Sequence, residues 1–346
     1  MQIKTISLDN FRSYPKKKFE FSPGVTAVVG PNTAGKSNLL EAIFLLAFGH
    51  SPRAQLEREM LRSGEKLAFV RATAHGSDPR DLEVVVTEMG KKFRVNGVAR
   101  RLSDFSQHFH VVLFSPEDLN LVTGSPDLRR RFLDFALGSV DYHYARISSE
   151  YDKVRRRRNR LLEQINQERA QELELGFWDA KLLEYGVATQ DQRKEFFDEI
   201  NHDLSEKKLE LDYHLSGLTA ERLLEYRPRE IAAETSLIGP HRDDFSFLKN
   251  EPMNRLTSEP IDLSAYGSRG EQRRAVLSLK AAELAYVGRR IGSRPVLLLD
   301  DIFSELDEEN RARVFDLIGE GQTIITTTDL NHIPTPLRKS LSVINL

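Results

Sequence analysis

A glycine-rich segment near the N-terminus constrains the fold of this 346-residue chain more than any other feature. Residues 30–37 read Gly-Pro-Asn-Thr-Ala-Gly-Lys-Ser and match the phosphate-binding pattern G-x-x-x-x-G-K-S/T. The apolar residues 25–29 before it predict a buried strand, and the apolar positions of residues 38–48 after it predict a helix. A strand, a glycine turn and a helix in this order predict a P-loop, and therefore a nucleotide-binding site in an α/β domain.

Each part of this segment suits a polyphosphate. Backbone N–H groups of the loop and of the helix N-terminus point at the phosphates. The Lys36 ammonium reaches the β- and γ-phosphates, and the Ser37 hydroxyl binds Mg²⁺. Thr33 suits the loop less well, because a positive φ is costly for a β-branched residue. The predicted ATP-binding residues of the loop are Gly30, Pro31, Asn32, Thr33, Ala34, Gly35, Lys36 and Ser37.

The composition is that of an ordinary soluble protein. Charged residues make up 29% of the chain and the formal net charge is -2, so any nucleic-acid binding must use a local basic patch. The absence of cysteine excludes disulfides, thiolate zinc sites and cysteine nucleophiles. No segment has the apolar length of a membrane helix, and residues 1–8 alternate like an edge strand rather than a signal peptide. We therefore expect a cytoplasmic protein with two domains or lobes.

The pattern of the chain changes twice, which predicts a nucleotide domain split by an insertion. Residues 1–125 carry strand signals and predict the N-terminal part of an ATPase domain. Over residues 126–230 the charge rises, and apolar residues follow a four-three spacing that is broken at Arg158. A turn predicted at residues 167–176 makes this insertion a helical lobe, in the form of a hairpin. Alternating strand and helix signals return in residues 231–346 and predict the C-terminal part of the ATPase domain.

Two adjacent carboxylates follow a second apolar strand. Residues 295–299 lead directly to Asp300 and Asp301, which is a Walker B pattern. At the carboxyl end of a strand, such acids face the ligand crevice of an open α/β sheet. Asp300 is predicted to hold Mg²⁺ together with Ser37, and Asp301 to orient or deprotonate the attacking water.

A short glycine-containing segment precedes a helix predicted at residues 271–289. Ser268 and Gly270 stand where this helix begins, so a hydroxyl, free N–H groups and the positive end of the helix dipole are available to a γ-phosphate. The same segment also fits a capping box, in which Ser268 and Glu271 exchange hydrogen bonds. The two interpretations are compatible.

The motifs stand in the order found in ABC-type ATPase heads, and the chain resembles the SMC-like branch of these heads that acts in DNA metabolism. Within this branch it resembles the RecF family of bacterial recombination mediators. The segments that carry the resemblance are residues 8–14, 114–119, 124–134, 239–244 and 299–307, besides the P-loop and residues 268–272. The resemblance implies an α/β fold of the ABC-type P-loop ATPase head: a mixed sheet with helices, an antiparallel β-subdomain and an inserted helical lobe. This lobe is too short for the long coiled coil of true SMC proteins.

The resemblance also implies how the site works. ATP and Mg²⁺ would be the cofactors, and two chains would dimerise head to head around ATP. The P-loop, Arg12 and Ser13 would contact ATP in cis, and Asp301 would be the catalytic carboxylate. The signature residues would contact the partner's ATP in trans, and they are Ser268, Arg269, Gly270, Glu271 and Gln272. Ser304 and Asp307 would lie at the dimer seam.

The implied function is ATP-dependent DNA binding in recombinational repair and replication-fork maintenance. The implied partners are duplex or junction DNA, RecR (with RecO), and the recombinase RecA, which the protein would help to load at gaps. Most ABC heads have Glu where this chain has Asp301, which fits a weak ATPase that serves as a switch. The alternatives are the ATPase subunit of a membrane transporter and a P-loop kinase acting on a small molecule.

A basic run in the predicted hairpin is the first candidate for DNA contact. Its members are Lys153, Arg155, Arg156, Arg157, Arg158 and Arg160. On a helix these residues spread positive charge around the circumference and can neutralise several phosphates. The alternative is a solvated arm balanced by acids of the returning helix. Further candidates are residues 16–18, Arg53, Arg58 and Arg62. Because no aromatic-rich platform for single strands is visible, we expect backbone-led binding with little sequence preference.

The sequence leaves the roles of some residues open. Candidates for the Q-loop residue of ABC heads are Glu117, Asp118 and Asn120. No histidine follows the strand predicted at residues 322–328 directly, and His332 is interpreted as a loop residue. His108 and His110 are interpreted as part of a strand entry, and residues 241–244 as charge pairing rather than a metal site.

Overall fold

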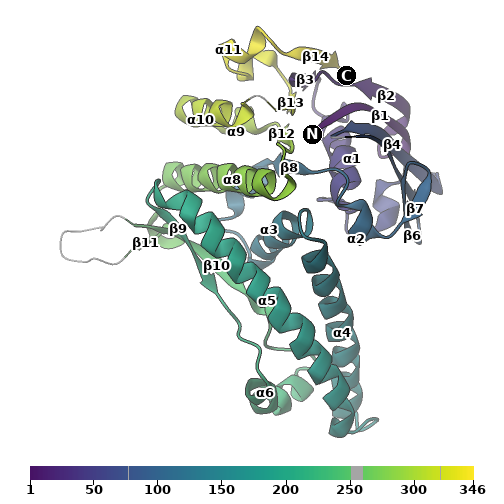
Figure 1. Cartoon of the computed structure of the whole chain (residues 1–346), viewed down its shortest axis with the longest axis vertical. Coiled ribbons are helices and arrows are strands. Elements are labelled where there is room, and N and C mark those ends of the chain that lie inside the picture. Colours follow the sequence, from purple (N-terminus) through teal and green to yellow (C-terminus); the bar gives the residue numbers. More distant parts are fainter. Residues whose placement is uncertain (77, 251–259, 320) are drawn as a thin grey trace. The chain divides into compact units, whose positions relative to one another are not determined.

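The computed structural model describes residues 1–76, 78–250, 260–319 and 321–346. The chain forms two compact units (Figure 1). Unit 1 contains residues 1–120 and 273–346, and unit 2 contains residues 121–272. The chain therefore leaves unit 1 once and returns to it once.

A five-stranded parallel sheet of order β14-β3-β13-β12-β8 carries the nucleotide motifs of unit 1. Its strands are β3 (Val25–Val29), β8 (Val111–Phe114), β12 (Val296–Asp300), β13 (Thr323–Thr327) and β14 (Ser342–Asn345). The strands β12 and β13 are buried almost throughout, as expected for parallel strands made of continuous apolar or β-branched runs. Because the strands are parallel, the carboxyl ends of β3, β12 and β13 lie at one edge of the sheet, where open α/β sheets bind ligands.

The helices of unit 1 include one that is buried almost completely. In α1 (Lys36–Phe48), eleven of the thirteen residues are buried, as expected for a helix that is apolar nearly all round. The other helices of this part are α2 (Leu102–Phe105), α8 (Arg269–Ile291), α9 (Ile302–Glu305), α10 (Glu308–Ile318) and α11 (Thr335–Arg338), with 3₁₀ turns η1 (Glu57–Met60), η2 (Pro116–Asn120) and η5 (Leu330–His332). The first four residues of α8 belong to unit 2.

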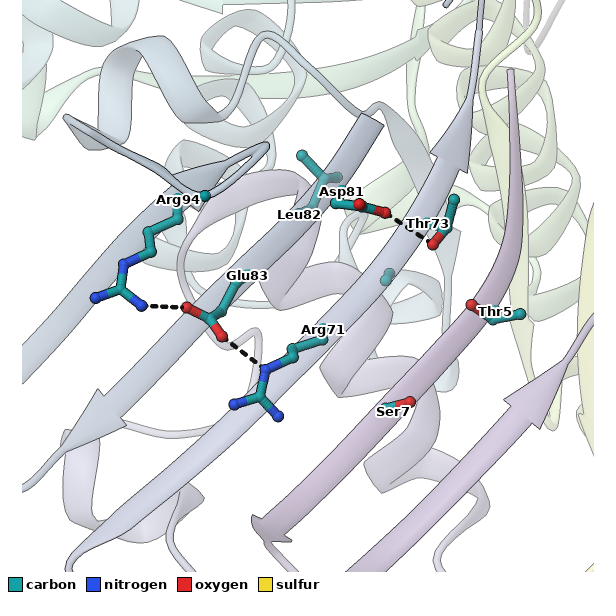
Figure 2. Close-up of a pocket in the computed structure, with 10 residues that line it drawn as sticks. Thr5, Ser7, Arg71, Thr73, Asp81, Leu82, Glu83 and Arg94 are labelled. Carbon is teal, nitrogen blue, oxygen red and sulfur yellow. Dashed lines mark hydrogen bonds and ion pairs between the residues drawn. The ribbon is translucent and has the colours of Figure 1, made fainter. Parts of the chain in front are cut away.

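A second, antiparallel sheet of order β2-β1-β4-β5-β6-β7 completes unit 1. Its strands are β1 (Gln2–Phe11), β2 (Tyr14–Glu20), β4 (Leu67–His75), β5 (Pro79–Thr87), β6 (Gly90–Val95) and β7 (Val98–Arg100). Its polar face has a shallow hollow of about 400 Å³, in which Glu83 accepts from Arg71 at 2.6 Å and from Arg94 at 2.8 Å (Figure 2). Such cross-strand ion pairs stabilise a solvated sheet face. The two sheets and their helices confirm the predicted fold class.

The expectation that residues 1–8 form an edge strand is wrong. Strand β1 pairs with β2 on one side and with β4 on the other. Only Arg12 and Ser13 connect β1 to β2, and this tight turn folds β2 back along the strand that would otherwise be the edge. The edge is β2, where Lys16, Lys17 and Lys18 are exposed, as is common on edges that must not pair further.

Unit 2 combines helices with a small sheet. Its elements are α3 (Pro126–Gly138), α4 (Tyr142–Asn166), η3 (Glu172–Glu174), α5 (Leu175–Ser205), β9 (Leu209–His214), α6 (Ala220–Ala232), η4 (Pro240–Arg242), β10 (Asp244–Lys249), β11 (Ile261–Asp262) and α7 (Leu263–Tyr266). The helices α4 and α5 lie side by side (Figure 1). Gly176 lies inside α5 instead of ending the turn. Unit 2 continues past residue 230, because β10 and β11 pair with β9 in a sheet of order β11-β10-β9.

No helix in the described ranges of the chain is both long and apolar enough to cross a membrane.

Candidate nucleotide site

The P-loop has the backbone geometry of a phosphate cradle. Gly35 has φ 101° and caps α1, whose N-terminus has no side-chain cap bond within the described part of the chain. A Cβ atom on Gly35 would lie 2.8 Å from the Tyr14 hydroxyl and 2.9 Å from Ser13 Oγ, so this position requires glycine. The free N–H groups of the first turn of α1 are left to bind an anion.

The Lys36 side chain curls back over the loop that it follows. Its Nζ donates to the carbonyl oxygens of Gly30 at 2.8 Å and Pro31 at 2.9 Å. An ammonium has three donors, so one remains for a phosphate oxygen. Thr33 adopts φ 77° in spite of its β-branched side chain. The loop therefore has the positive φ at this position that was expected to be costly for threonine.

A side-chain hydrogen bond connects the P-loop helix α1 to the Walker B strand β12. Ser37 Oγ donates to Asp300 Oδ1 at 3.1 Å, across 263 residues of sequence. Thr326, near the end of the neighbouring strand β13, donates to the same oxygen at 2.7 Å. The sequence did not single out Thr326, because its role depends on β13 lying beside β12. A hydroxyl and a carboxylate at this distance are oxygen donors of the kind that Mg²⁺ prefers.

Asp301 is held in an unusual backbone conformation at the start of α9. Its φ is 49°, and its N–H donates to Thr326 Oγ1 at 3.0 Å. Its Oδ1 atom is buried and has no hydrogen-bond partner in the part of the chain that the structure describes. Burial raises the pKa of Asp301, an effect that the charge of Lys36 partly offsets. This carboxylate therefore holds a proton more readily than an ordinary aspartate.

His332 lies closer to the site than the sequence suggested. It ends the 3₁₀ turn η5, five residues after β13, and its charge lowers the pKa of Asp301. Its Nδ1 atom is buried without a hydrogen-bond partner among the described residues. The sequence signal that could have placed His332 near the site is its position shortly after β13, a strand that ends at the ligand-binding edge of the sheet.

The turn between β1 and β2 is fixed against α1 by three successive residues. The Arg12 guanidinium donates to both carboxylate oxygens of Glu41, at 2.9 and 2.6 Å. Asn38 donates to Ser13 Oγ at 3.0 Å, and Tyr14 donates to the Gly35 carbonyl at 3.1 Å. The sequence-predicted residues Arg12 and Ser13 therefore contact the P-loop helix, through partners that the sequence did not reveal.

The signature segment forms the capping box at the start of α8. Ser268 donates to Glu271 from its N–H at 3.0 Å and from its hydroxyl at 2.8 Å, and the Glu271 N–H donates back to Ser268 Oγ at 3.3 Å. Hydrogen bonds from Ser268 and the ion pair with Lys249 lower the pKa of Glu271 to about 2. Gln272 donates to the carbonyl oxygens of Leu263 and Gly267. Ser268 and Arg269 are exposed.

The remaining ATPase positions have local roles. Ser304 Oγ donates to the Asp301 carbonyl at 2.7 Å, and the Asp307 side chain accepts from the Asn310 N–H at 2.9 Å; both are exposed. Of the Q-loop candidates, Glu117 and Asn120 are exposed. The third, Asp118, accepts from the N–H and the hydroxyl of Ser115 directly after β8.

The basic run divides into exposed and buried members. On α4, Lys153, Arg156, Arg157 and Arg160 are exposed. Arg155 is partly exposed and pairs with Asp152 at 3.2 Å. Residues three, four and seven apart share one face of a helix, so the exposed members form a continuous basic stripe.

Arg158 contradicts its prediction as a DNA contact. Its side chain is 0% exposed and pairs with Asp179 on α5 and Glu230 on α6, each at 2.7 Å. Its third donor group bonds Ser236 Oγ at 3.0 Å. The break in the apolar pattern of α4 is therefore a buried ion cluster that joins three helices, and this side chain cannot reach a phosphate.

The segment of residues 239–244 is also structural. Asp243 is fully buried and accepts from Gln190, Tyr213 and Arg193. Asp244 pairs with Arg129 at 2.6 Å. No group of three His, Cys, Asp or Glu residues suited to a metal occurs among the described residues. Charge pairing is thus what the structure shows for this segment.

The geometry agrees with comparisons to known proteins. The family model of the RecF/RecN/SMC N terminal domain matches residues 2–335. The chain is 34% identical to the DNA replication and repair protein RecF of Macrococcus caseolyticus, over 96% of this chain and 94% of that protein. It is 36% identical to the protein of the same name from Halalkalibacterium halodurans, with the same two shares.

Solved structures show the same likeness. The recombination mediator protein RecF with ATPrS matches with a TM-score of 0.86 at 32% identity, over 96% of this chain and 94% of that one. RecF with ATP matches with a TM-score of 0.84 at 32% identity, over 94% and 92%. An Smc head bound to the C-winged helix domain of ScpA shares the fold, with a TM-score of 0.51 at 20% identity over 95% and 90%. The chain therefore belongs to the RecF/RecN/SMC family, and within it to the RecF proteins.

Proposed function

We propose that this chain is a cytoplasmic, ATP-dependent DNA-binding protein of recombinational repair and replication-fork maintenance. The observation that carries the proposal is the contact between Ser37 and Asp300, which joins the P-loop to the Walker B strand in one site. Two solved RecF relatives are described with ATP or its analogue. No observation favours the alternatives of a transporter ATPase or a small-molecule kinase.

ATP is proposed to bind across the N-terminus of α1. The uncapped first turn offers backbone N–H groups, and Lys36 offers one free donor to a phosphate oxygen. The Ser37 hydroxyl and the Asp300 carboxylate fit Mg²⁺, because both are hard oxygen donors and lie 3.1 Å apart. Bound there, the ion would neutralise charge on the phosphates.

Asp301 is proposed as the carboxylate that orients and deprotonates the attacking water. Its buried Oδ1 atom has no hydrogen-bond partner among the described residues, and burial raises its pKa, so it can accept a hydrogen bond and then a proton. The αL backbone and the bond to Thr326 fix where this oxygen lies. A shorter side chain than glutamate supports slow hydrolysis that serves as a switch.

The signature residues are proposed to act on the ATP of a second copy of the chain. Ser268 and Arg269 are exposed at the start of α8, where the positive end of the helix dipole suits a γ-phosphate. Gly270, Glu271 and Gln272 follow in the first turn of the same helix. Ser304 and Asp307 are exposed after the Walker B strand, which supports their place at the seam of a head-to-head dimer.

DNA is proposed to contact the basic stripe of α4, formed by Lys153, Arg156, Arg157 and Arg160. The stripe consists of exposed cationic side chains, which suit phosphate oxygens and support backbone-led binding to duplex or junction DNA. RecR (with RecO) and the recombinase RecA are the proposed protein partners. The naming of relatives as recombination mediators in the RecFOR pathway supports them.

Two substitutions separate the steps of this proposal. Lys36→Met is expected to abolish ATP binding, because it removes the ammonium from the loop. Ser268→Arg is expected to bind ATP normally but to remain a monomer, because its bulk stands where a partner's phosphate would lie. Thr219→Arg is the matched control. Like Ser268, Thr219 is an exposed residue of unit 2 that caps a helix, in this case α6. Calorimetry with ATP and sedimentation with ATP and Mg²⁺ measure both properties. ATP-dependent dimers of the Ser268→Arg variant would contradict the proposal.

A further inference from the structure

The tip of the α4–α5 hairpin, residues 167–178, exposes an aromatic side chain. Phe177 is the third residue of α5 and is 62% exposed. Its neighbour Trp178 is only partly exposed, and packs against two apolar clusters, one that contains Leu182 and one that contains Leu162. Single exposed apolar residues are common on protein surfaces, so what surrounds Phe177 decides whether it has a use.

Two ring contacts connect Phe177 to the basic stripe of α4. The rings of Phe177 and Trp178 meet edge to face, with centroids 5.0 Å apart and an interplanar angle of 82°. The Arg157 guanidinium lies over Trp178, 5.5 Å from the ring centroid. An edge-to-face contact takes up at most one face of the Phe177 ring, so an exposed ring face and an exposed cation lie close together across the hairpin.

Arg157 differs from its neighbours in how it is held. Lys153 pairs with Glu150 at 2.7 Å, and Arg155 pairs with Asp152 at 3.2 Å. The Arg157 guanidinium has no ion pair or hydrogen bond with any residue that the structure describes, and is held by the indole face instead. A guanidinium that stacks on a ring keeps the N–H donors at its edge for an anion.

An exposed ring beside an unpaired cation suits an unpaired nucleotide. A base stacks on an aromatic face, whereas the bases inside a duplex are covered by each other. The phosphate beside such a base requires a cation, and the exposed residues Arg156 and Arg160 continue the positive charge along α4. Glu172 and Glu174 are exposed in η3, so a DNA backbone would follow α4 and not the connection between the helices.

We infer that the hairpin tip binds an unpaired DNA base, which stacks on Phe177 while Arg157 contacts the phosphate beside it. The inference rests on the proposed function, because the basic stripe would carry the backbone of the same DNA. It gives the chain a preference for a duplex with a single-stranded tail over a blunt duplex. Stacking uses no hydrogen bond to a base edge, so the preference is independent of the tail's sequence.

Substitutions of Phe177 test whether an aromatic ring is required. Fluorescence anisotropy with ATP and Mg²⁺ compares a blunt duplex with the same duplex carrying an oligothymidylate tail. Phe177→Ala and Phe177→Leu are expected to weaken binding of the tailed duplex by about 5- to 150-fold and to leave the blunt duplex unchanged. Phe177→Tyr, which keeps a ring, should bind both like the parent. Parent-like binding of the tailed duplex by Phe177→Leu would overturn the inference.

Two control variants separate stacking from general apolar contact. Tyr142→Ala removes another exposed aromatic ring of α4, 46% exposed, and Leu173→Ala removes an apolar side chain of the tip that is 89% exposed. Both should bind the tailed duplex like the parent. A loss in Leu173→Ala as large as that in Phe177→Ala would show that the tip is an apolar contact surface, as for a protein partner, and would overturn the inference.

Salt dependence separates the two parts of the site. Arg157→Gln should reduce the slope of log affinity against log salt on the tailed duplex by about 0.7, because it removes one phosphate contact from a single strand. Phe177→Ala should keep the slope of the parent, because stacking releases no counterions. An unchanged slope in Arg157→Gln would overturn the phosphate contact.

Trp178 reports on the site directly, because it is the only tryptophan of the chain. The tailed duplex is expected to change its fluorescence emission more than the blunt duplex does. A parent that binds the blunt duplex but shows equal emission and equal affinity with both DNAs would overturn the inference and leave the proposed function standing. A parent that binds neither duplex would contradict the proposed function, and titration with oligothymidylate alone, followed by Trp178 emission, would still decide on the stacking site.

Discussion

At the scale of single residues, four of the eight non-glycine residues with positive φ in the described part of the chain lie in or next to the nucleotide motifs. Asn10 near the end of β1, Arg12 in the β1–β2 turn, Thr33 in the P-loop and Asp301 after β12 all have positive φ, between 49° and 77°. Each such residue costs on the order of 1–3 kcal/mol, and such conformations persist where the surrounding structure fixes them. Here the contacts that fix them also place the phosphate loop and the carboxylate of the proposed reaction.

Two P-loop substitutions should have opposite results. Gly35→Ala places a Cβ atom against Tyr14 and Ser13 and should abolish ATP binding. Thr33→Gly relieves a positive φ worth roughly 1–3 kcal/mol, which offsets an unfolded-state entropy cost of about 0.5–1 kcal/mol. It should therefore keep ATP binding and the melting temperature. Calorimetry and thermal melting check both, and normal ATP binding by Gly35→Ala would show the loop geometry to be wrong.

The capping box should give stability a specific pH dependence. The folded-state pKa of Glu271 is about 2, below its ordinary 4.5, so its contribution is fully present above pH 4.5 and is lost as the pH falls towards 2. Glu271→Gln should lower the melting temperature slightly near neutral pH, and by less as the pH falls through this window. The effect is small because the carboxylate is exposed to solvent. A pH-independent difference between variant and parent would refute the assignment.

The sequence could predict those site residues whose roles are set by neighbours along the chain. The P-loop, Asp300 and the Ser268–Glu271 box are of this kind, because a strand end or a helix start defines them. Thr326 and Glu41 could not be found this way, since each acts on a residue of another strand or turn.

At the scale of elements, the unit 2 helices are joined by a buried cation. Arg158 of α4 meets Asp179 of α5 and Glu230 of α6, where an apolar seam was expected. The sequence showed the break in the seam but not its cause, because Glu230 lies 72 residues further along the chain. A run of basic residues therefore predicts exposed charge only on the solvent-facing side of its helix. A basic residue on the buried side, such as Arg158, pairs with internal carboxylates instead.

Removing the buried Arg158 side chain should destabilise unit 2 without changing its exposed surface. Arg158→Ala removes the ion-pair partner that the structure shows for the buried Glu230 and leaves Asp179 with Arg227, so it should lower the free energy of unfolding by about 3–5 kcal/mol. Arg160→Ala, on the exposed stripe, is the control and should change it by less than about 0.5 kcal/mol. Chemical denaturation measures both. Equal, small effects would mean that the Arg158 cluster contributes nothing to stability.

The exposed stripe should affect DNA binding instead. Neutralising Lys153, Arg156 and Arg160 should reduce the slope of log affinity against log salt by roughly 0.9 for each phosphate that the protein no longer neutralises, about 2–3 in all. Lys181 and Lys194 on α5, which pair with neighbouring acids, are the matched control and should leave the slope unchanged. Fluorescence anisotropy with a duplex over a range of salt gives the slope. An unchanged slope in the stripe variant would remove α4 from the DNA interface.

At the scale of the whole molecule, the chain carries both groups of residues that the proposed head-to-head dimer would bring together on ATP. Unit 1 holds the P-loop, Asp300 and Asp301, and the exposed Ser268 begins a helix that continues from unit 2 into unit 1. Motif order along the sequence predicted these parts, because it does not depend on packing. The place of β1 inside its sheet was missed, since strand order is decided by the two-residue turn that returns β2.

ATP-gated dimerisation on DNA is tested most directly by measuring self-association and DNA affinity together. Sedimentation and duplex binding would be compared with ATP and Mg²⁺, with ADP, and without nucleotide. We expect a dimer with higher duplex affinity in ATP and Mg²⁺ alone, and a monomer with weak affinity in the other two conditions. ATP hydrolysis by a chain that neither dimerises nor binds DNA would contradict ATP-gated dimerisation.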